Sequence, residues 1–405
     1  MEADTGADRD ELPSAMEPLT LGEGCRRRGR IMDLAFDLAR KSAGFRSSLP
    51  AGLIGPLAGL VRSMNCYYSN LIEGHDTHPV DIERALRNDY SRDARKRDLQ
   101  LEARAHIEVQ KWIDEGGLSG RQAVTVAGIR EIHRRFCDRL PEDLLWVEDP
   151  DTKERIPVTP GEIRTRDVRV GRHIAISPGS LPRFLERFAH VYGRLGGSES
   201  IAAAAIAHHR LLWMHPFLDG NGRVARLMSH AQLRDLLDTG SLWSVARGLA
   251  RSVQDYKRLL ADCDLPRRND LDGRGNLSEE ASGEFTEFFL GVCLDQATFM
   301  EESMQPERFR TRILMWAEEE ARSGRLPASS GLILEALLYR GELARGDAGS
   351  IAGTGERQAR RIVAALIDRG AVASESARSA LRLAFPATLA PRWMPGLFPE
   401  SAGTA

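Results

Sequence analysis

The chain has 405 residues, of which 42% are apolar and 28% are charged. This composition is typical of soluble globular proteins and excludes a chain that is disordered throughout. The 56 Lys and Arg residues nearly balance the 58 Asp and Glu residues, so the chain as a whole is not a general polyanion binder. At about 150 residues per domain, the length predicts two or three domains.

Cysteine usage and hydropathy indicate a reducing, aqueous compartment. The five cysteines never form a Cys-x-x-Cys pair, which argues against a disulfide framework and against a Cys-rich zinc site. The first residues, MEADTGADRDEL, are acidic and lack the apolar run of a signal peptide. No stretch approaches the roughly 18 apolar residues of a membrane span. We therefore expect a cytoplasmic protein that does not bind membranes.

The spacing of apolar residues divides the chain into four regions and predicts a mainly α fold. Residues 1–30, first acidic and then basic, are predicted to be a disordered tail. Residues 31–117 show helical spacing and end at an Asp-Glu-Gly-Gly stop, which predicts an N-terminal helical region. Residues 118–322 are predicted to form a larger core. Residues 323–405 follow a Ser-Gly-Arg-Leu-Pro segment and are predicted to be a C-terminal domain.

The core departs from helical spacing at one short segment. In residues 168–176, β-branched side chains alternate around Gly171, which predicts a small β-hairpin. An Ala-rich run over residues 201–214 favours a helix. A loop rich in Pro, Gly, Asp and Asn is predicted over residues 264–282, and a further helix over residues 285–300.

The C-terminal region has a recognisable order of elements. A helix over residues 332–338 precedes a short helical turn and a third helix, whose apolar stripe ends at Gly370. Leu381, Leu383 and Phe385 then alternate as in a strand. Helix, short helix, helix and hairpin is the order of a winged helix-turn-helix domain.

The segment that carries most chemical information is HPFLDGNGRVAR, residues 215–226. The proline after His215 disfavours helical geometry at that histidine, so a long helix ends there. Gly220 and Gly222 flank Asn221 and allow a tight turn with exposed amides. A new helix begins at once. Such a glycine-rich turn at a helix N-terminus is an anion-binding site.

The side chains around this turn suit a nucleotide. Arg223 and Arg226 are three residues apart on the new helix, and two guanidinium groups suit a polyphosphate. Asp219 supplies a hard oxygen ligand for Mg²⁺, which would bridge the phosphates. His215 is the one group in the loop with an ordinary pKa near neutrality, as a general base needs. The loop is therefore predicted to hold nucleotide phosphates beside a base directed at an incoming hydroxyl.

Residues 215–226 match the Fic family signature, His-Pro-Phe-x-[Asp/Glu]-Gly-Asn-[Gly/Lys]-Arg-x-x-Arg, at every position. The resemblance implies a helical Fic core over residues 118–322, with the small hairpin as its flap, where an extended target segment would bind. It also implies protein adenylyltransferase activity, in which AMP passes from ATP to a protein hydroxyl with Mg²⁺ and pyrophosphate leaves. By this resemblance His215 is the base and Asp219 the metal ligand.

The same resemblance implies which residues would bind each phosphate of ATP. Asn221 and the amides of Gly220 and Gly222 would hold the α-phosphate, while Arg223 and Arg226 would hold the β- and γ-phosphates. Gly222 stands where the related Doc kinases carry Lys. Because those enzymes transfer the γ-phosphate, Gly222 favours AMP transfer.

Two further segments resemble parts of the family. Ser69 and Glu73, in the sequence SNLIEG, match its inhibitory motif, [Ser/Thr]-x-x-x-Glu-[Gly/Asn]. Because the motif precedes the core, the chain resembles the class with an N-terminal inhibitory helix, in which Glu73 would pair with Arg226. Tyr256 matches an aromatic of the family's adenine-binding helix, although the second tyrosine of that motif is Lys257 here. Tyr256 is thus predicted either to line the base pocket or to pack in the core.

Other functions are compatible with the same residues. Glu73 could orient water, so the pocket could instead remove AMP from a modified protein. A third hypothesis is a nucleotide-sensing DNA-binding regulator, with Arg357, Arg360 and Arg361 on the third C-terminal helix contacting phosphates. Residues 330–386 contain eight Arg against six acidic residues, and so small an excess favours protein docking or packing. The sequence does not identify the target protein, which could be the chain itself.

Overall fold

The protein is described by a computed structural model that covers residues 6–149, 152–376 and 378–399. The helices up to the core are α1 (Arg28–Ser47), α2 (Ala51–Ile72), α3 (Pro79–Leu86) and α4 (Ala94–Asp114). The core helices are α5 (Gly120–Ala123), α6 (Val126–Cys137), α7 (Leu181–Tyr192), α8 (Gly197–Met214), α9 (Asn221–Leu237), α10 (Val245–Arg251), α11 (Val253–Asp262) and α12 (Glu279–Ser303). The C-terminal helices are α13 (Pro306–Arg322), α14 (Ser330–Arg340), α15 (Ala348–Ala352), α16 (Glu356–Asp368) and α17 (Ala390–Trp393).

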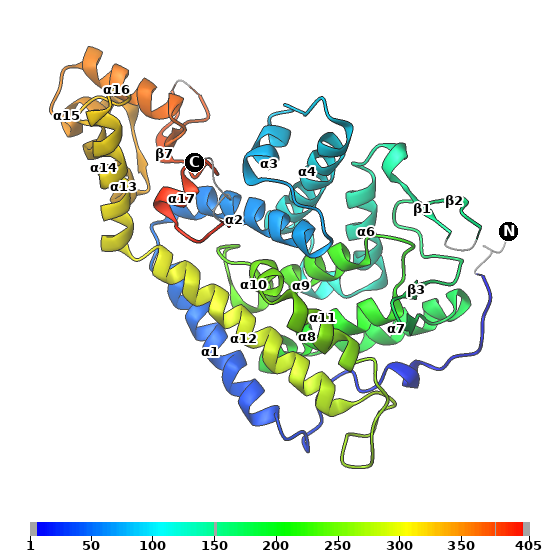
Figure 1. Cartoon of the computed structure of the whole chain (residues 1–405). Coiled ribbons are helices and arrows are strands. Elements are labelled where there is room, and N and C mark those ends of the chain that lie inside the picture. The colour runs from blue at the N-terminus through cyan, green and yellow to red at the C-terminus, as the bar shows by residue number, and fades with distance from the viewer. Residues whose placement is uncertain (1–5, 150–151, 377, 400–405) are drawn as a thin grey trace.

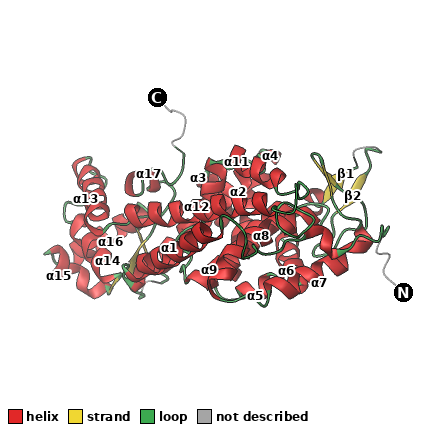
Figure 2. Ribbon diagram, turned by 90° about the horizontal axis from the view of Figure 1, so that it is seen from below, coloured by secondary structure: helices red, strands yellow, loops and turns green. Residues whose placement is uncertain are grey.

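Strands are few and short, as Figure 2 shows, which confirms the mainly α fold class. Two separate antiparallel hairpins are β1 (Trp146–Glu148) with β2 (Arg155–Pro157), and β3 (Arg169–Val170) with β4 (His173–Ile174). A three-stranded sheet has the order β5-β7-β6, from β5 (Glu342–Leu343), β6 (Val372–Ala373) and β7 (Leu381–Leu383). The β3–β4 hairpin lies where the sequence predicts the flap, whereas β1–β2 was not predicted. No helix within the described residues is long and apolar enough to cross a membrane.

Helix α8 occupies the middle of the core. It packs along α9 and also contacts α1, α7 and α12. The run Ala202–Ala205 is buried, and its small side chains allow neighbouring helices to approach closely. Every residue of α8 from Ser200 to Leu211 is buried, so the helix lies in the protein interior. The loop between α8 and α9 therefore starts and ends on two helices that cannot easily shift.

Helix α2 is built into the same core through polar contacts. Asn65 donates to the side-chain oxygen of Gln110 on α4 at 2.6 Å. Arg62 pairs with Asp114 at 2.9 Å, and His230 on α9 contacts the other oxygen of Asp114 at 2.7 Å. Both side chains of the α2–α4 ion pair are largely buried. These contacts fix α2 against α4 and α9 rather than leaving it on the surface.

The N-terminal segment corrects the prediction of a disordered tail over residues 1–30. Residues 6–27 run along the outside of the core and lead into α1 (Figure 1), and Pro13–Met16 forms a 3₁₀ turn. Met16 is fully buried and Leu19 is 2% exposed. A few apolar anchors and side-chain ion pairs hold this segment, and such widely spaced anchors give no periodic signal in the sequence. Residues 1–5 lie outside the described residues.

The C-terminal unit begins earlier than predicted. Helix α13 packs on α14 and α17 (Figure 1). Arg310 on α13 pairs with Glu335 at 2.5 Å, and Arg312 donates to the carbonyl of Trp393 at 2.6 Å. This packing moves the boundary from residue 323 to about residues 304–305. The Ser-Gly-Arg-Leu-Pro segment is a turn between two packed helices, which has the same composition as a linker.

The elements that follow α13 keep the predicted order of helix, short helix, helix and hairpin, with the added strand β5. The winged-helix class and DNA binding stay predictions. The chain then returns to the core, where the hydroxyl of Tyr68 on α2 donates to the carbonyl of Leu397 at 3.1 Å. Arg247 on α10 donates to the carbonyl of Gly396 at 2.7 Å. The last described residues thus join the C-terminal unit to α2.

A close backbone contact at the start of α2 yields a stability prediction. A Cβ added at Gly52 would lie 2.6 Å from the carbonyl carbon of Gly341, whereas one added at Gly44, an exposed residue of α1, would meet nothing within 4 Å. We expect Gly52→Ala to lower the free energy of unfolding by about 1–3 kcal/mol, because backbone atoms must move. Gly44→Ala should raise it by about 0.5–1 kcal/mol. Urea denaturation followed by circular dichroism measures both, and equal effects would contradict the close contact.

Candidate active site

The loop between α8 and α9 is held in a compact shape by its own residues. His215 has φ 50° and Gly220 has φ 80°, so both lie in the left-handed region. The side chain of Asn221 accepts from the amide of Phe217 at 3.0 Å and donates to its carbonyl at 2.8 Å. Phe217 is buried and stacks on His133 with ring centroids 3.9 Å apart. Both polar atoms of the Asn221 side chain thus brace the loop, which leaves its backbone amide for an anion.

The tautomer and the pKa of His215 suit a group that accepts a proton. Its Nδ1 lies 3.3 Å from the carbonyl oxygen of Leu212, so Nδ1 carries the proton and Nε2 keeps its lone pair. Burial, with the nearby charge of Arg164, lowers the pKa of His215 to about 4. The imidazole is therefore neutral at physiological pH and able to accept a proton.

The N-terminus of α9 provides donors for phosphate oxygens. Helix α9 begins at Asn221, so the amides of Asn221, Gly222 and Arg223 have no acceptor within the helix. Free amides and the helix dipole together favour an anion at this position. The Asp219 side chain is exposed, and it forms no ion pair with any residue that the structure describes. Its carboxylate suits Mg²⁺, which binds through one or two carboxylates together with substrate phosphates.

Arg226, the last residue of the signature, is not free. It is 2% exposed and reaches across to the C-terminal end of α2. Its Nε donates to the hydroxyl of Ser69 at 2.8 Å, and its Nη2 pairs with the carboxylate of Glu73 at 2.5 Å. Burial opposes ionisation of Glu73, but Arg226 outweighs it and holds the pKa of Glu73 below its ordinary value. The two segments predicted from sequence motifs thus meet.

Residues 123–233 match the model of the Fic/DOC family. The chain carries a Fic domain. Proteins named protein adenylyltransferase Fic are similar to it. One from Drosophila grimshawi is 28% identical over 169 residues, which are 41% of this chain and 32% of that protein. One from Culex quinquefasciatus is 29% identical over 187 residues, 44% of this chain and 34% of that protein.

The matched region is thus about one third of the length of these curated relatives. The crystal structure of a Fic family protein from Desulfovibrio desulfuricans G20 superposes with a TM-score of 0.51. It is 16% identical in sequence, and the match covers 87% of this chain and 95% of that chain. This likeness confirms the Fic-type fold of the helical core.

Gly222 of the Fic loop has a second role that the sequence does not reveal. A Cβ at this position would lie 2.4 Å from the carboxylate oxygen of Glu73. Glycine therefore allows Glu73 to lie directly against the first turn of α9. At this position the Fic signature allows Gly or Lys. In this chain Gly222 also leaves room for the contact with Glu73 at the end of α2.

Arg223 faces a second carboxylate, which sequence reasoning missed. It is 7% exposed and lies 3.8 Å from Glu102 on α4. Glu102 is also within 2.8 Å of the Nδ1 of His75, two residues after Glu73. Neither Glu102 nor His75 belongs to a motif, and only the packing of α4 on α2 brings them to the Fic loop.

Tyr256 lies in the core, the second of the two predicted alternatives. It is 3% exposed, and its hydroxyl lies 2.7 Å from the Nε2 of His208, whose Nδ1 contacts Ser229. Burial raises the pKa of Tyr256 to about 12. Contact with adenine stays a prediction for this residue, and in this conformation its ring is covered by Phe285 and other core side chains.

The His75–Glu102 contact gives a pH-dependent prediction. The hydrogen bond to Glu102 raises the pKa of His75, so Glu102→Gln should lower that pKa, as measured by NMR titration of the imidazole. Glu108→Gln is the matched control, because Glu108 lies on the same helix and pairs with Arg104 instead. An unchanged pKa in Glu102→Gln would contradict the hydrogen bond.

The same contact affects stability in a defined pH window. Since the folded-state pKa of His75 is raised, the pair stabilises the fold fully below the ordinary histidine pKa of about 6.5. That contribution is lost as the pH rises through the raised pKa. The stability difference between wild type and Glu102→Gln should therefore narrow toward alkaline pH.

Proposed function

We propose that the chain is an autoinhibited protein adenylyltransferase, which transfers AMP from ATP to a protein side-chain hydroxyl and releases pyrophosphate. The observation that carries this proposal is a neutral, half-buried His215 beside the anion-binding N-terminus of α9, with two arginines on the same helix. The names of the relatives support the same activity. Their partial coverage leaves the activity of this chain to experiment.

The chemistry follows from the position of each group. The target hydroxyl would donate its hydrogen bond to Nε2 of His215, and its oxygen would attack the α-phosphorus. The new oxygen–phosphorus bond forms as the bond from the α-phosphorus to the bridging oxygen of pyrophosphate breaks. The hydroxyl proton passes to His215.

The other groups of the loop hold the triphosphate. The amides at the start of α9 would bind the α-phosphate, and Arg223 and Arg226 would neutralise the charge of the leaving pyrophosphate. Mg²⁺, held by Asp219 and the phosphates, would supply further charge neutralisation. Asn221 contributes by bracing the loop at Phe217.

The reaction type is tested by following two labels. Protein incubated with Mg²⁺ and α-³²P-ATP, in a host lysate or alone, should acquire label that depends on His215, while γ-³²P-ATP should give no label that depends on His215. His215→Ala should abolish the label, because the other proton acceptor in the loop, the carboxylate of Asp219, is assigned to Mg²⁺. His190→Ala, an exposed histidine on α7, is the control and should keep the label. Label from γ-³²P-ATP would show a kinase instead.

The proposed inhibition follows from the contacts of Arg226. The Nε and Nη2 of the guanidinium donate to Ser69 and Glu73, so these two nitrogens are unavailable to a γ-phosphate. ATP that binds in this state would be displaced, with its α-phosphate turned away from His215. A misplacement of about 1 Å can cost on the order of 10²-fold in rate.

Glu73→Gly should therefore raise AMP labelling by roughly tenfold or more, because it frees Arg226. Glu115→Gly is a matched control: Glu115 also caps the C-terminal end of a helix and precedes a glycine, but its ion pair is with exposed Lys111. Arg226→Ala breaks the same ion pair yet should not activate, since it removes the phosphate contact as well. Equal, low labelling in wild type and Glu73→Gly, with ATP binding intact in both, would contradict the autoinhibition.

A further inference from the structure

Arg164 lies at the base of the flap, before β3, and is 3% exposed. Its guanidinium donates to four backbone carbonyls and to no side chain among the described residues. The acceptors are the carbonyls of His215 at 2.7 Å, Arg166 at 2.7 Å, Ile176 at 2.5 Å and Met214 at 3.3 Å. Burial lowers its pKa to about 10, so the group remains a cation at neutral pH.

These carbonyls belong to two different parts of the site. Met214 and His215 end helix α8, where unpaired carbonyls and the helix dipole favour a cation. Arg166 and Ile176 lie on the two sides of the flap hairpin. In addition, the backbone amide of Arg164 donates to the carbonyl of Pro216 at 3.0 Å. One side chain therefore ties the flap to the residue that carries the base.

The conformation of His215 explains why such a tie is needed. A left-handed conformation costs a non-glycine residue roughly 1–2 kcal/mol, and it persists only when its surroundings hold it. The hydrogen bond from Arg164 to the His215 carbonyl fixes the peptide group directly after the strained residue. Without it, the imidazole could turn away from the start of α9.

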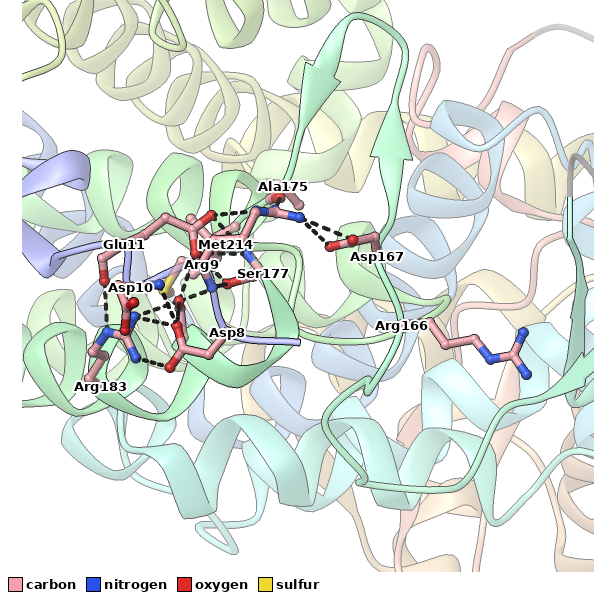
Figure 3. A network of polar contacts seen from close by, with 12 residues as sticks. Asp8, Arg9, Asp10, Glu11, Arg166, Asp167, Ala175, Ser177, Arg183 and Met214 are labelled. Atoms are coloured by element: carbon pink, nitrogen blue, oxygen red, sulfur yellow. Dashed lines mark hydrogen bonds and ion pairs between the residues drawn. The ribbon is translucent and has the colours of Figure 1, made fainter. Parts of the chain in front are cut away.

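A second set of contacts holds the two sides of the flap together. Residues 8–11, which we call the N-terminal strap, lie against the flap and α7 (Figure 3). Arg9 binds both carboxylate oxygens of Asp167 at 3.0 Å and donates to the carbonyl of Ala175 at 3.2 Å. Asp167 and Ala175 come from opposite sides of the hairpin, so Arg9 bridges them.

The strap itself is anchored on α7 and the turn before it. Asp8 forms a two-pronged ion pair with Arg183, at 2.6 and 2.7 Å. Glu11 accepts from the amide of Ser177 at 3.1 Å and from the hydroxyl of Ser180 at 2.7 Å. In Figure 3 the side chains of Asp8, Glu11 and Arg183 converge on one side of the flap, while Arg166 points away from them.

We propose that Arg164 is a positioning residue that fixes His215 and the flap relative to one another, and that the N-terminal strap maintains this arrangement by holding the two sides of the flap together. This inference rests on the proposed function for its kinetic part only. Its structural part concerns the order of residues 214–218 and 164–177, which can be measured without ATP.

The structural part is tested by hydrogen exchange in the full-length protein. Arg164→Met should increase exchange at residues 214–218 and in the flap by tenfold or more, because four hydrogen bonds are lost. Arg166→Met is the matched control, since its side chain points away and it should leave residues 214–218 unchanged. If Arg164→Met does not fold, Arg164→Lys, which keeps the charge but has fewer donors, serves in its place.

The kinetic part uses Glu73→Gly as the parent and self-labelling from α-³²P-ATP. Arg164→Met should lower the rate at saturating ATP by on the order of 10²-fold while the ATP concentration for half-maximal rate stays the same. The pH profile separates charge from geometry. Removing the cation near His215 should move the acidic limb to higher pH in Arg164→Met, while Arg164→Lys should keep the parent profile at a reduced rate.

The strap is tested by the Arg9–Asp167 pair. Arg9→Ala and Asp167→Ala should each raise exchange in residues 166–176 about two- to fivefold. The double variant should show little further increase, because both changes remove the same contact. Arg187→Ala, which breaks the Glu17 ion pair between the same N-terminal segment and α7, should leave flap exchange and self-labelling at parent values.

The outcomes separate this inference from the proposed function. Unchanged exchange at residues 214–218 and an unchanged rate in both Arg164 variants would overturn the inference, even where the parent transfers AMP. Increased exchange in a chain that never labels protein would support the positioning role and count against adenylyl transfer alone. Strap variants with parent-like flap exchange would overturn the part assigned to residues 8–11.

Discussion

Two buried arginines at the start of α9 are the constraint on which the rest of the site depends. Arg223 and Arg226 are 7% and 2% exposed, and buried cations are costly unless anions compensate them. In this structure the compensation comes from carboxylates, Glu73 for Arg226 and Glu102 for Arg223. A nucleotide triphosphate would offer the same kind of compensation from its own oxygens. The two buried positive charges that suit the start of α9 to phosphate therefore also favour the binding of acidic side chains at the same place.

This demand explains why helices outside the Fic domain match are part of the site. Glu73 comes from the end of α2 and Glu102 from α4, both before residue 123, where the family match begins. The α2–α4 pair is held by the Arg62–Asp114 contact and by His230 on α9. A change in any of these buried partners would therefore alter how α2 and α4 lie against the two arginines.

How much the sequence predicts depends on whether an interaction is local. The loop of residues 215–226 and the flap follow from local rules about proline, glycine and alternation, and the structure places both as expected. Glu73 was found because it lies in a short motif. The contacts of Glu102 and Arg164 could not be predicted from the sequence. Their partners, Arg223 and His215, are 121 and 51 residues away along the chain, and no spacing rule links such distant residues. The packing of residues 6–27 was not predicted for a related reason. This segment is held by isolated buried side chains such as Met16, which form no periodic pattern in the sequence.

The way α2 is held limits how the proposed inhibition could be relieved. Detaching the whole helix would uncover its buried second half, including the Asn65–Gln110 bond and the Arg62–Asp114 pair, and would leave their partners unsatisfied at a cost of several kcal/mol. Glu73, in contrast, is the C-terminal cap of α2, its side chain is 33% exposed, and Gly74 follows it with φ 85°. Rotation of the Glu73 side chain, or fraying of this last turn, would free Arg226 while the remainder of α2 stays packed. Displacement by the phosphate itself therefore requires less energy than removal of the helix, and release is expected to be local.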